Sequence, residues 1–156
     1  MHPIAKLAAL TVSAALVLAA CGTAGAPAAA KRTIYMSAVE YKGSTEVAKE
    51  AFPAQAVPAG GGYQLKEPKD GKWENSTYRW EPGTIVVYQG DDVELQIWGV
   101  NGKEHPGRIE GYDKAFGVQR GQLTTVSFKA DKAGVFRILC DIHNPSMTGT
   151  LVVLGR

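Results

Sequence analysis

The chain has 156 residues, of which 45% are hydrophobic and 21% charged, with 17 basic residues against 15 acidic ones. This length suits one domain with additional segments. A formal net charge of +2 excludes the broad basic surface that nucleic-acid binding requires, so no nucleic-acid partner is expected. The 18 glycines and 8 prolines indicate a chain with many turns.

The first twenty residues have the form of an export signal. Lys6 is the only charged residue before residue 31, and an apolar run extends from Leu7 to Ala20. This run is shorter than the roughly 20 residues that a membrane-spanning helix needs. It has the charged start and apolar middle of a signal peptide. We therefore expect residues 1–20 to be removed and the protein to be exported to the periplasm or cell envelope.

The signal ends in "LAAC", a stretch that resembles the lipobox of bacterial lipoproteins. The resemblance implies that Cys21 is lipidated, becomes the mature N-terminus and anchors the protein to a membrane. Residues 21–32 are small and flexible and would then form a tether, which leaves residues 33–156 as the single folded domain. A plain signal cleaved after Ala20 or near Ala24 is the alternative.

The segment that follows the tether, residues 33–72, is expected to contain a strand, a short helix and a loop. Residues 33–40 alternate well enough for a first strand. A short helix is expected over residues 44–52, capped by a hydroxyl side chain and ended by Pro53. The Pro and Gly content of residues 53–63 predicts a loop, and residues 64–72 are polar and are expected to be irregular.

From residue 73 onward the sequence is rich in short strands separated by turn signals. The turns are "QGDD", "NG" and "DKAG", which contain the residues that favour tight turns. The predicted strands are 73–80, 84–88, 93–100, 122–130, 135–140 and 149–154. Short strands at such intervals predict an all-β sandwich or barrel.

The stretch "CDIHNPSM", residues 140–147, places a Cys, a His and a Met close together. If Cys21 carries lipid, Cys140 has no disulfide partner and needs another role. Once the signal peptide is removed, the remaining histidines are His105 and His143. Individually these residues have simpler explanations, such as a core thiol, a surface histidine or a core methionine.

Together, the residues indicate one metal site. Period-2 alternation in 135–140 turns Cys140 toward the core at the end of a strand. His143 and Met147 follow in a loop that returns into the last strand. A thiolate with two imidazoles and an axial thioether is the ligand set of electron-transfer copper sites, so His105 is expected to supply the second imidazole. Zinc is the chemical rival, but its sites rarely use Met.

These residues make the chain resemble the cupredoxins, the blue-copper family of Greek-key β-sandwiches, over about residues 80–155. "EPGTIVVYQGDDVEL" is similar to the strand–turn–strand that precedes the first ligand in that family. The resemblance implies one copper ion held by His105, Cys140, His143 and Met147. It also implies that His143 is the ligand through which electrons pass.

"AFGVQ", "FKADKAGVF", "CDIH" and "GTLVV" are more narrowly similar to nitrosocyanin, a red-copper relative. Nitrosocyanin has a Glu in place of the upstream His and a His in place of the Met. Met147 favours a blue-type site here, whereas Pro106 after His105 departs from the usual cupredoxin pattern. Glu110 is therefore the alternative upstream ligand.

The expected function is the transfer of single electrons between redox partners, such as a cytochrome or a membrane oxidoreductase. Four ligands would leave no open position on the metal, so an electron carrier is expected rather than an enzyme. Two alternatives stay open. One is a copper-binding or delivery protein, and the other is a nitrosocyanin-like red-copper protein that acts in nitrogen-oxide chemistry.

Overall fold

The computed structural model describes residues 27–156, so the predicted signal peptide and the predicted lipidation site at Cys21 lie outside the described residues. The described residues form ten strands. These are β1 (Lys31–Glu46), β2 (Tyr63–Lys69), β3 (Lys72–Glu81), β4 (Thr84–Tyr88), β5 (Asp92–Gly99), β6 (Glu104–Ile109), β7 (Lys114–Gln119), β8 (Leu123–Lys129), β9 (Gly134–Cys140) and β10 (Thr148–Leu154). Within this part of the chain, no helix is long and apolar enough to cross a membrane.

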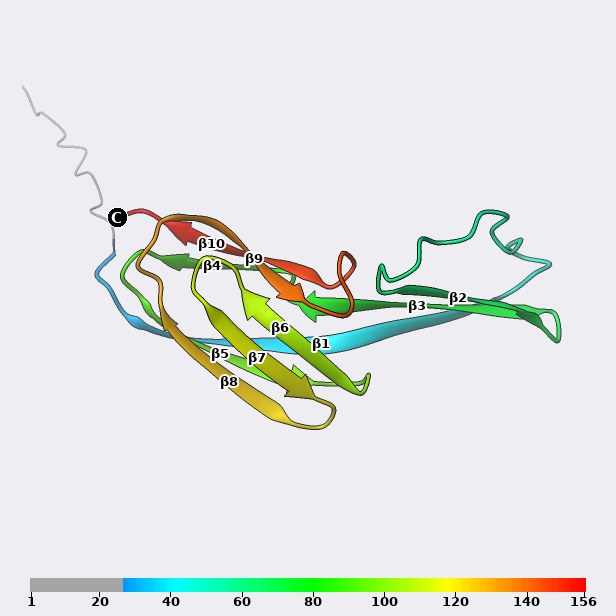
Figure 1. The fold of residues 1–156 in the computed structure, drawn as a ribbon, viewed down its shortest axis with the longest axis horizontal. Coiled ribbons are helices and arrows are strands. Elements are labelled where there is room, and N and C mark those ends of the chain that lie inside the picture. Colours follow the sequence, from blue (N-terminus) through cyan, green and yellow to red (C-terminus); the bar gives the residue numbers. More distant parts are fainter. Residues whose placement is uncertain (1–26) are drawn as a thin grey trace, which may run out of the picture.

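The strands form two five-stranded sheets, in the orders β2-β3-β1-β5-β8 and β4-β10-β9-β6-β7 (Figure 1). Two pairings, β1 with β5 and β10 with β4, are parallel, and the others are antiparallel. The predicted all-β sandwich is confirmed. Strand β1 starts at Lys31, slightly before the first predicted strand, and pairs with β5 from that residue.

The core lies between the two sheets and follows the alternation of the strands. Val93, Leu95 and Ile97 of β5 are buried, as the alternating sequence predicts. Ile138 of β9 and Leu151 of β10 are fully buried in the same hydrophobic cluster. Each such side chain contributes about 1.5–3 kcal/mol relative to an exposed position. The sandwich therefore provides a rigid frame for the loops at its ends.

The helix expected over residues 44–52 is wrong. Strand β1 continues to Glu46 and pairs with β3 as far as the register partners Glu46 and Lys72. Residues 64–72 are also more regular than expected, because β2 pairs with β3 along most of this stretch. Pairing with a neighbouring strand thus overrides the local helix propensity of the segment.

Strands β6 and β7 are absent from the sequence-based prediction. Pro106 and Gly107 lie inside β6, and Gly117 lies inside β7, and both residue types are depleted in strands. The two strands pair with each other, and β6 also pairs with β9. This matters for the site, because His105 is the second residue of β6.

A three-stranded ribbon projects beyond the sandwich, toward the right in Figure 1. It consists of β2 and the adjoining halves of β1 and β3. Phe52 covers Trp73 of β3 edge-on, with ring centroids 5.7 Å apart. The Trp73 indole N–H also donates to the carbonyl of Glu50 at 2.9 Å. This small apolar contact holds the segment between β1 and β2 against the ribbon.

A buried carboxylate, Asp91, ties both ends of the described chain together. Its side chain has no exposed surface and accepts hydrogen bonds from the backbone amides of Ala30 and Tyr88. It also pairs with Arg32 at 3.0 Å and with the side chain of Arg156. Burial alone would raise the pKa of Asp91, but the two amides and Arg32 lower it to about 2.

Asp91→Asn should lower the thermal unfolding temperature at pH 7, because the variant loses the negative charge that both arginines face. The folded-state pKa of about 2 lies below the ordinary 3.8, so the stabilisation is complete above pH 3.8 and is lost as the pH falls toward 2. Thermal unfolding followed by circular dichroism at a series of pH values measures both effects.

Asp92→Asn is the matched control, since the Asp92 side chain is 70% exposed and pairs only with Lys129 in the described structure. We expect this variant to unfold close to the wild-type temperature. Equal unfolding temperatures for the Asp91 and Asp92 variants would contradict the role assigned to Asp91.

Candidate metal centre

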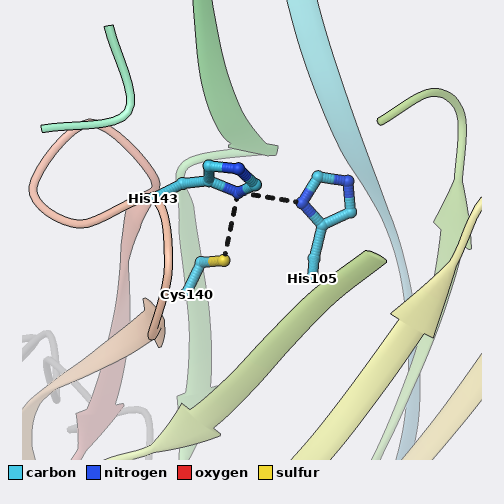
Figure 2. Close-up of side chains that lie close together, drawn as sticks. All are labelled: His105, Cys140 and His143. Atoms are coloured by element: carbon cyan, nitrogen blue, oxygen red, sulfur yellow. Dashed lines mark hydrogen bonds between the residues drawn. The ribbon is translucent and has the colours of Figure 1, made fainter. Parts of the chain in front are cut away.

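Three side chains converge at one end of the sandwich: His105, Cys140 and His143 (Figure 2). Their donor atoms lie within 4.8 Å of one another. The His143 Nδ1 atom is 3.3 Å from the His105 Nδ1 atom and 3.4 Å from the Cys140 sulfur. A thiol and two imidazole nitrogens thus surround a single point, although 38 positions and the strands β7 to β9 separate the two histidines along the chain.

Pairing between β6 and β9 brings His105 to Cys140. The two strands are antiparallel, with Gly107 opposite Cys140, so His105 lies just beyond this register pair. The amide of Asp141 donates to the carbonyl of Pro106 at 2.8 Å and extends the pairing past the end of β9. The ligand loop therefore leaves β9 directly beside the start of β6.

Backbone hydrogen bonds within the loop between β9 and β10 hold its two ends together. The Cys140 amide donates to the Met147 carbonyl at 3.1 Å, and the Met147 amide donates to the His143 carbonyl at 2.8 Å. These two bonds fold residues 141–146 into a tight loop, which returns His143 over Cys140. The two residues between Cys140 and His143 thus give the chain the length that this loop needs to bring the imidazole over the thiol.

Burial controls the chemistry of the donors. Cys140 and His105 have no exposed surface, and His143 is partly exposed. Burial raises the pKa of the Cys140 thiol, and hydrogen bonds from the amides of Ile142 and His143 act in the opposite direction. Burial and the neighbouring His105 lower the pKa of His143. His143 is therefore neutral at pH 7, as a metal ligand must be.

A hydrogen bond fixes the tautomer of His105. Its Nε2 atom lies 2.9 Å from the carbonyl oxygen of Asn101. A carbonyl oxygen can only accept, so Nε2 carries the proton and the Nδ1 lone pair points toward Cys140 and His143. Hydrogen-bond partners of this kind orient metal-bound histidines generally. The sequence marks Asn101 only as part of a turn.

Aromatic and glycine contacts fix the two imidazole rings. Tyr78 of β3 stacks on His143 with ring centroids 3.7 Å apart and an interplanar angle of 9°. Gly102 lies against the other ring, since a Cβ atom added there would be 2.8 Å from the His105 Nε2 atom. Gly62 lies equally close to the ligand loop, where a Cβ atom would be 2.6 Å from the His143 carbonyl oxygen. None of these neighbours carries a sequence signal for a metal site.

Met147 lies at the end of the ligand loop, where β10 begins. Its side chain is fully buried in the same hydrophobic cluster as Cys140. Its backbone bonds to both Cys140 and His143, as described above. Its role as an axial ligand stays a prediction.

Glu110 lies away from the three donors. It follows the far end of β6, five residues from His105, which corresponds to about 16 Å of extended strand. Its carboxylate accepts two hydrogen bonds from Arg137, at 2.6 and 3.1 Å. The structure therefore does not bring this alternative ligand to the site.

Solved structures share the fold of this chain. A copper nitrite reductase from Nitrosomonas europaea matches with a TM-score of 0.55 and 15% identity, over 81% of this chain and 42% of that protein. A multicopper oxidase, mgLAC, matches with a TM-score of 0.51 and 17% identity, over 82% of this chain and 40% of that protein. The chain thus spans about two fifths of both proteins. No protein-family description and no curated protein sequence matches it.

The chain is a cupredoxin-fold protein with a His–Cys–His donor group at one end of its sandwich. A thiolate with two imidazoles is a donor set that suits copper, and the fold agrees with that assignment. His105, Cys140 and His143 are the residues that would hold the ion. The resemblance drawn from the sequence is confirmed at the level of the fold.

Gly102→Ala should weaken copper binding, because the new methyl group would displace the buried His105 ring. Changes beside a metal-bound histidine typically cost about tenfold to a hundredfold in metal affinity. Gly102 also has a φ of +79°, which costs a non-glycine residue about 1–2 kcal/mol. Competition with a copper chelator measures the affinity, and thermal unfolding measures the stability.

Gly121→Ala separates the effect on copper affinity from the effect on stability. Gly121 has a similar φ of +74°, but an added Cβ atom would meet nothing within 4 Å. We expect this variant to lose stability and to keep its copper affinity. If both variants bind copper as the wild type does, the packing of Gly102 against His105 has no part in metal binding.

Proposed function

We propose that the protein is an electron carrier that holds one copper ion between His105, Cys140 and His143, with Met147 as the fourth ligand. The observation that carries this proposal is the convergence of three donor side chains, of which Cys140 and His105 are fully buried and His143 is partly exposed. When bound, copper supplies a one-electron couple between Cu(II) and Cu(I). The protein's own contribution is to keep the donors in one arrangement for both oxidation states.

The surroundings of the donors support this role. The hydrogen bond from His105 to Asn101 and the stack of Tyr78 on His143 restrict both imidazoles. Buried surroundings exclude water from Cys140, which has no exposed surface. With Met147 as the fourth ligand, no open position would remain on the metal, which favours electron transfer over binding and turnover of a substrate.

His143 is the proposed point of electron entry and exit. It is the only one of the three donor residues with exposed surface, and it lies beside the exposed Pro145. A redox protein, such as a cytochrome or a membrane oxidoreductase, would bind at this end of the sandwich. The lipobox-like stretch before Cys21 supports a cell-envelope location with a membrane anchor, where such partners are found.

The two alternative functions receive less support. A nitrosocyanin-like red-copper site requires a carboxylate ligand, and Glu110 is instead paired with Arg137. A delivery protein requires ready release of the metal, whereas Cys140 and His105 are completely buried. Electron transfer therefore agrees best with the positions of these side chains.

The copper-loaded domain should show an intense thiolate-to-copper absorption band in the visible range and narrow hyperfine splitting in its EPR spectrum. Cys140→Ser should abolish the band completely, because serine provides no thiolate sulfur. His105→Ala should change or abolish the spectrum, since it removes one of the imidazoles. Absorption and EPR spectra of the three proteins, each with one equivalent of Cu(II), provide the measurement.

Glu110→Gln is the matched control, and we expect it to keep the wild-type spectrum. A red-copper spectrum that disappears in Glu110→Gln but persists in His105→Ala would overturn the proposed ligands. A colourless protein that releases copper readily to a chelator would instead favour copper delivery.

A further inference from the structure

Glu40 is a carboxylate that the proposed function does not use, and it is nearly buried. Its side chain is only 9% exposed, although it lies where β1 leaves the sandwich and enters the ribbon. It pairs with Lys42 at 3.0 Å, and the Lys42 side chain is 65% exposed. Burying a carboxylate is costly, so this position calls for a function.

Glu40 is linked to His143 through Tyr78. Glu40 and Tyr78 are direct register partners in the antiparallel pairing of β1 with β3. The proximity of the two side chains lowers the pKa of Glu40 and raises that of Tyr78. The Tyr78 ring then stacks on His143, as described above. A single aromatic ring thus separates the buried carboxylate from one proposed ligand.

Glu40 is linked to His105 through Asn101. The Glu40 amide donates to the Asn101 side-chain oxygen at 2.6 Å, and the Asn101 side-chain amide donates to the Glu40 carbonyl at 2.9 Å. The backbone carbonyl of Asn101 accepts the Nε2 proton of His105. These bonds hold residue 40 at a fixed position relative to the second imidazole.

Glu40 is ionised at neutral pH. Burial alone would raise its pKa, but hydrogen bonds and charge interactions lower the pKa below its ordinary 4.5, chiefly through Lys42 and Ser76. A fixed negative charge stabilises a doubly charged ion more than a singly charged one. A negative charge that is linked to the imidazoles through Tyr78 and Asn101 must therefore act differently on the two oxidation states of copper.

We propose that Glu40 sets the reduction potential of the copper site, because its negative charge favours Cu(II) over Cu(I). The inference rests on the proposed function, because it requires a copper ion that cycles between these states. Glu40 is not one of the donor residues. It acts through Tyr78 and through the electric field of its carboxylate.

Glu40→Gln should raise the reduction potential, since the substitution removes the charge and keeps the size and polarity of the side chain. Glu40→Asp retains the charge and should stay near the wild-type potential. Protein-film voltammetry of the copper-loaded proteins measures the potentials. The visible absorption band of each variant shows whether the ligands are unchanged.

Glu74→Gln is the matched control. Glu74 lines the same surface hollow of about 400 Å³ as Glu40, but its side chain is 56% exposed and pairs with Lys66. Solvent screens this charge, so the potential should stay at the wild-type value. Equal shifts for Glu40→Gln and Glu74→Gln, or no shift for either, would overturn the inference.

Lys42→Gln tests the inference with Glu40 in place, so the result does not depend on whether Glu40→Gln folds. Lys42 lies 3.0 Å from the nearly buried Glu40 carboxylate, so its removal leaves that carboxylate without a counter-charge, and the reduction potential should fall. An unchanged or raised potential would contradict the inference. A wild-type protein without a reversible copper couple would contradict the proposed function, whereas a reversible couple that is insensitive to both substitutions contradicts the inference alone.

Discussion

The site depends on the pairing of β6 with β9. This pairing places Gly107 opposite Cys140 and brings His105 within reach of the ligand loop. It also requires close packing, because a Cβ atom on Gly107 would lie 2.7 Å from the Phe116 ring and 3.0 Å from the Leu139 carbonyl oxygen. A side chain at residue 107 would push β6 away from its neighbours, and His105 would move with the strand.

Without a metal ion, the close approach of these donor atoms is energetically unfavourable. Cys140 is a fully buried thiol, and the His143 Nδ1 atom lies 3.4 Å from its sulfur and 3.3 Å from the His105 Nδ1 atom. The His105 Nδ1 atom offers a lone pair, so its approach to the His143 nitrogen is favourable only if a proton or a metal ion lies between them. A soft cation would satisfy all three donors together, which explains why a domain would hold them so close to one another.

The sequence was sufficient for the sandwich and for the grouping of Cys140 with His143, because strand alternation and a short loop determine both. It was insufficient for the strand that carries His105, since Pro106 and Gly107 weaken the strand signal there. The helix expected at 44–52 failed because pairing with β3 extends β1. Tyr78 reaches His143 from β3, and the turn at Asn101 directs a backbone carbonyl toward His105, so only the folded chain reveals these neighbours.

The central claim is that a thiolate and two imidazoles of this chain bind one copper ion. X-ray absorption spectroscopy at the copper edge tests it most directly, because it identifies the atoms bound to the metal. The claim predicts one short copper–sulfur bond and two imidazole nitrogens in the wild-type protein, and no copper–sulfur bond in Cys140→Ser. A copper environment of nitrogen and oxygen alone in the wild-type protein would contradict it.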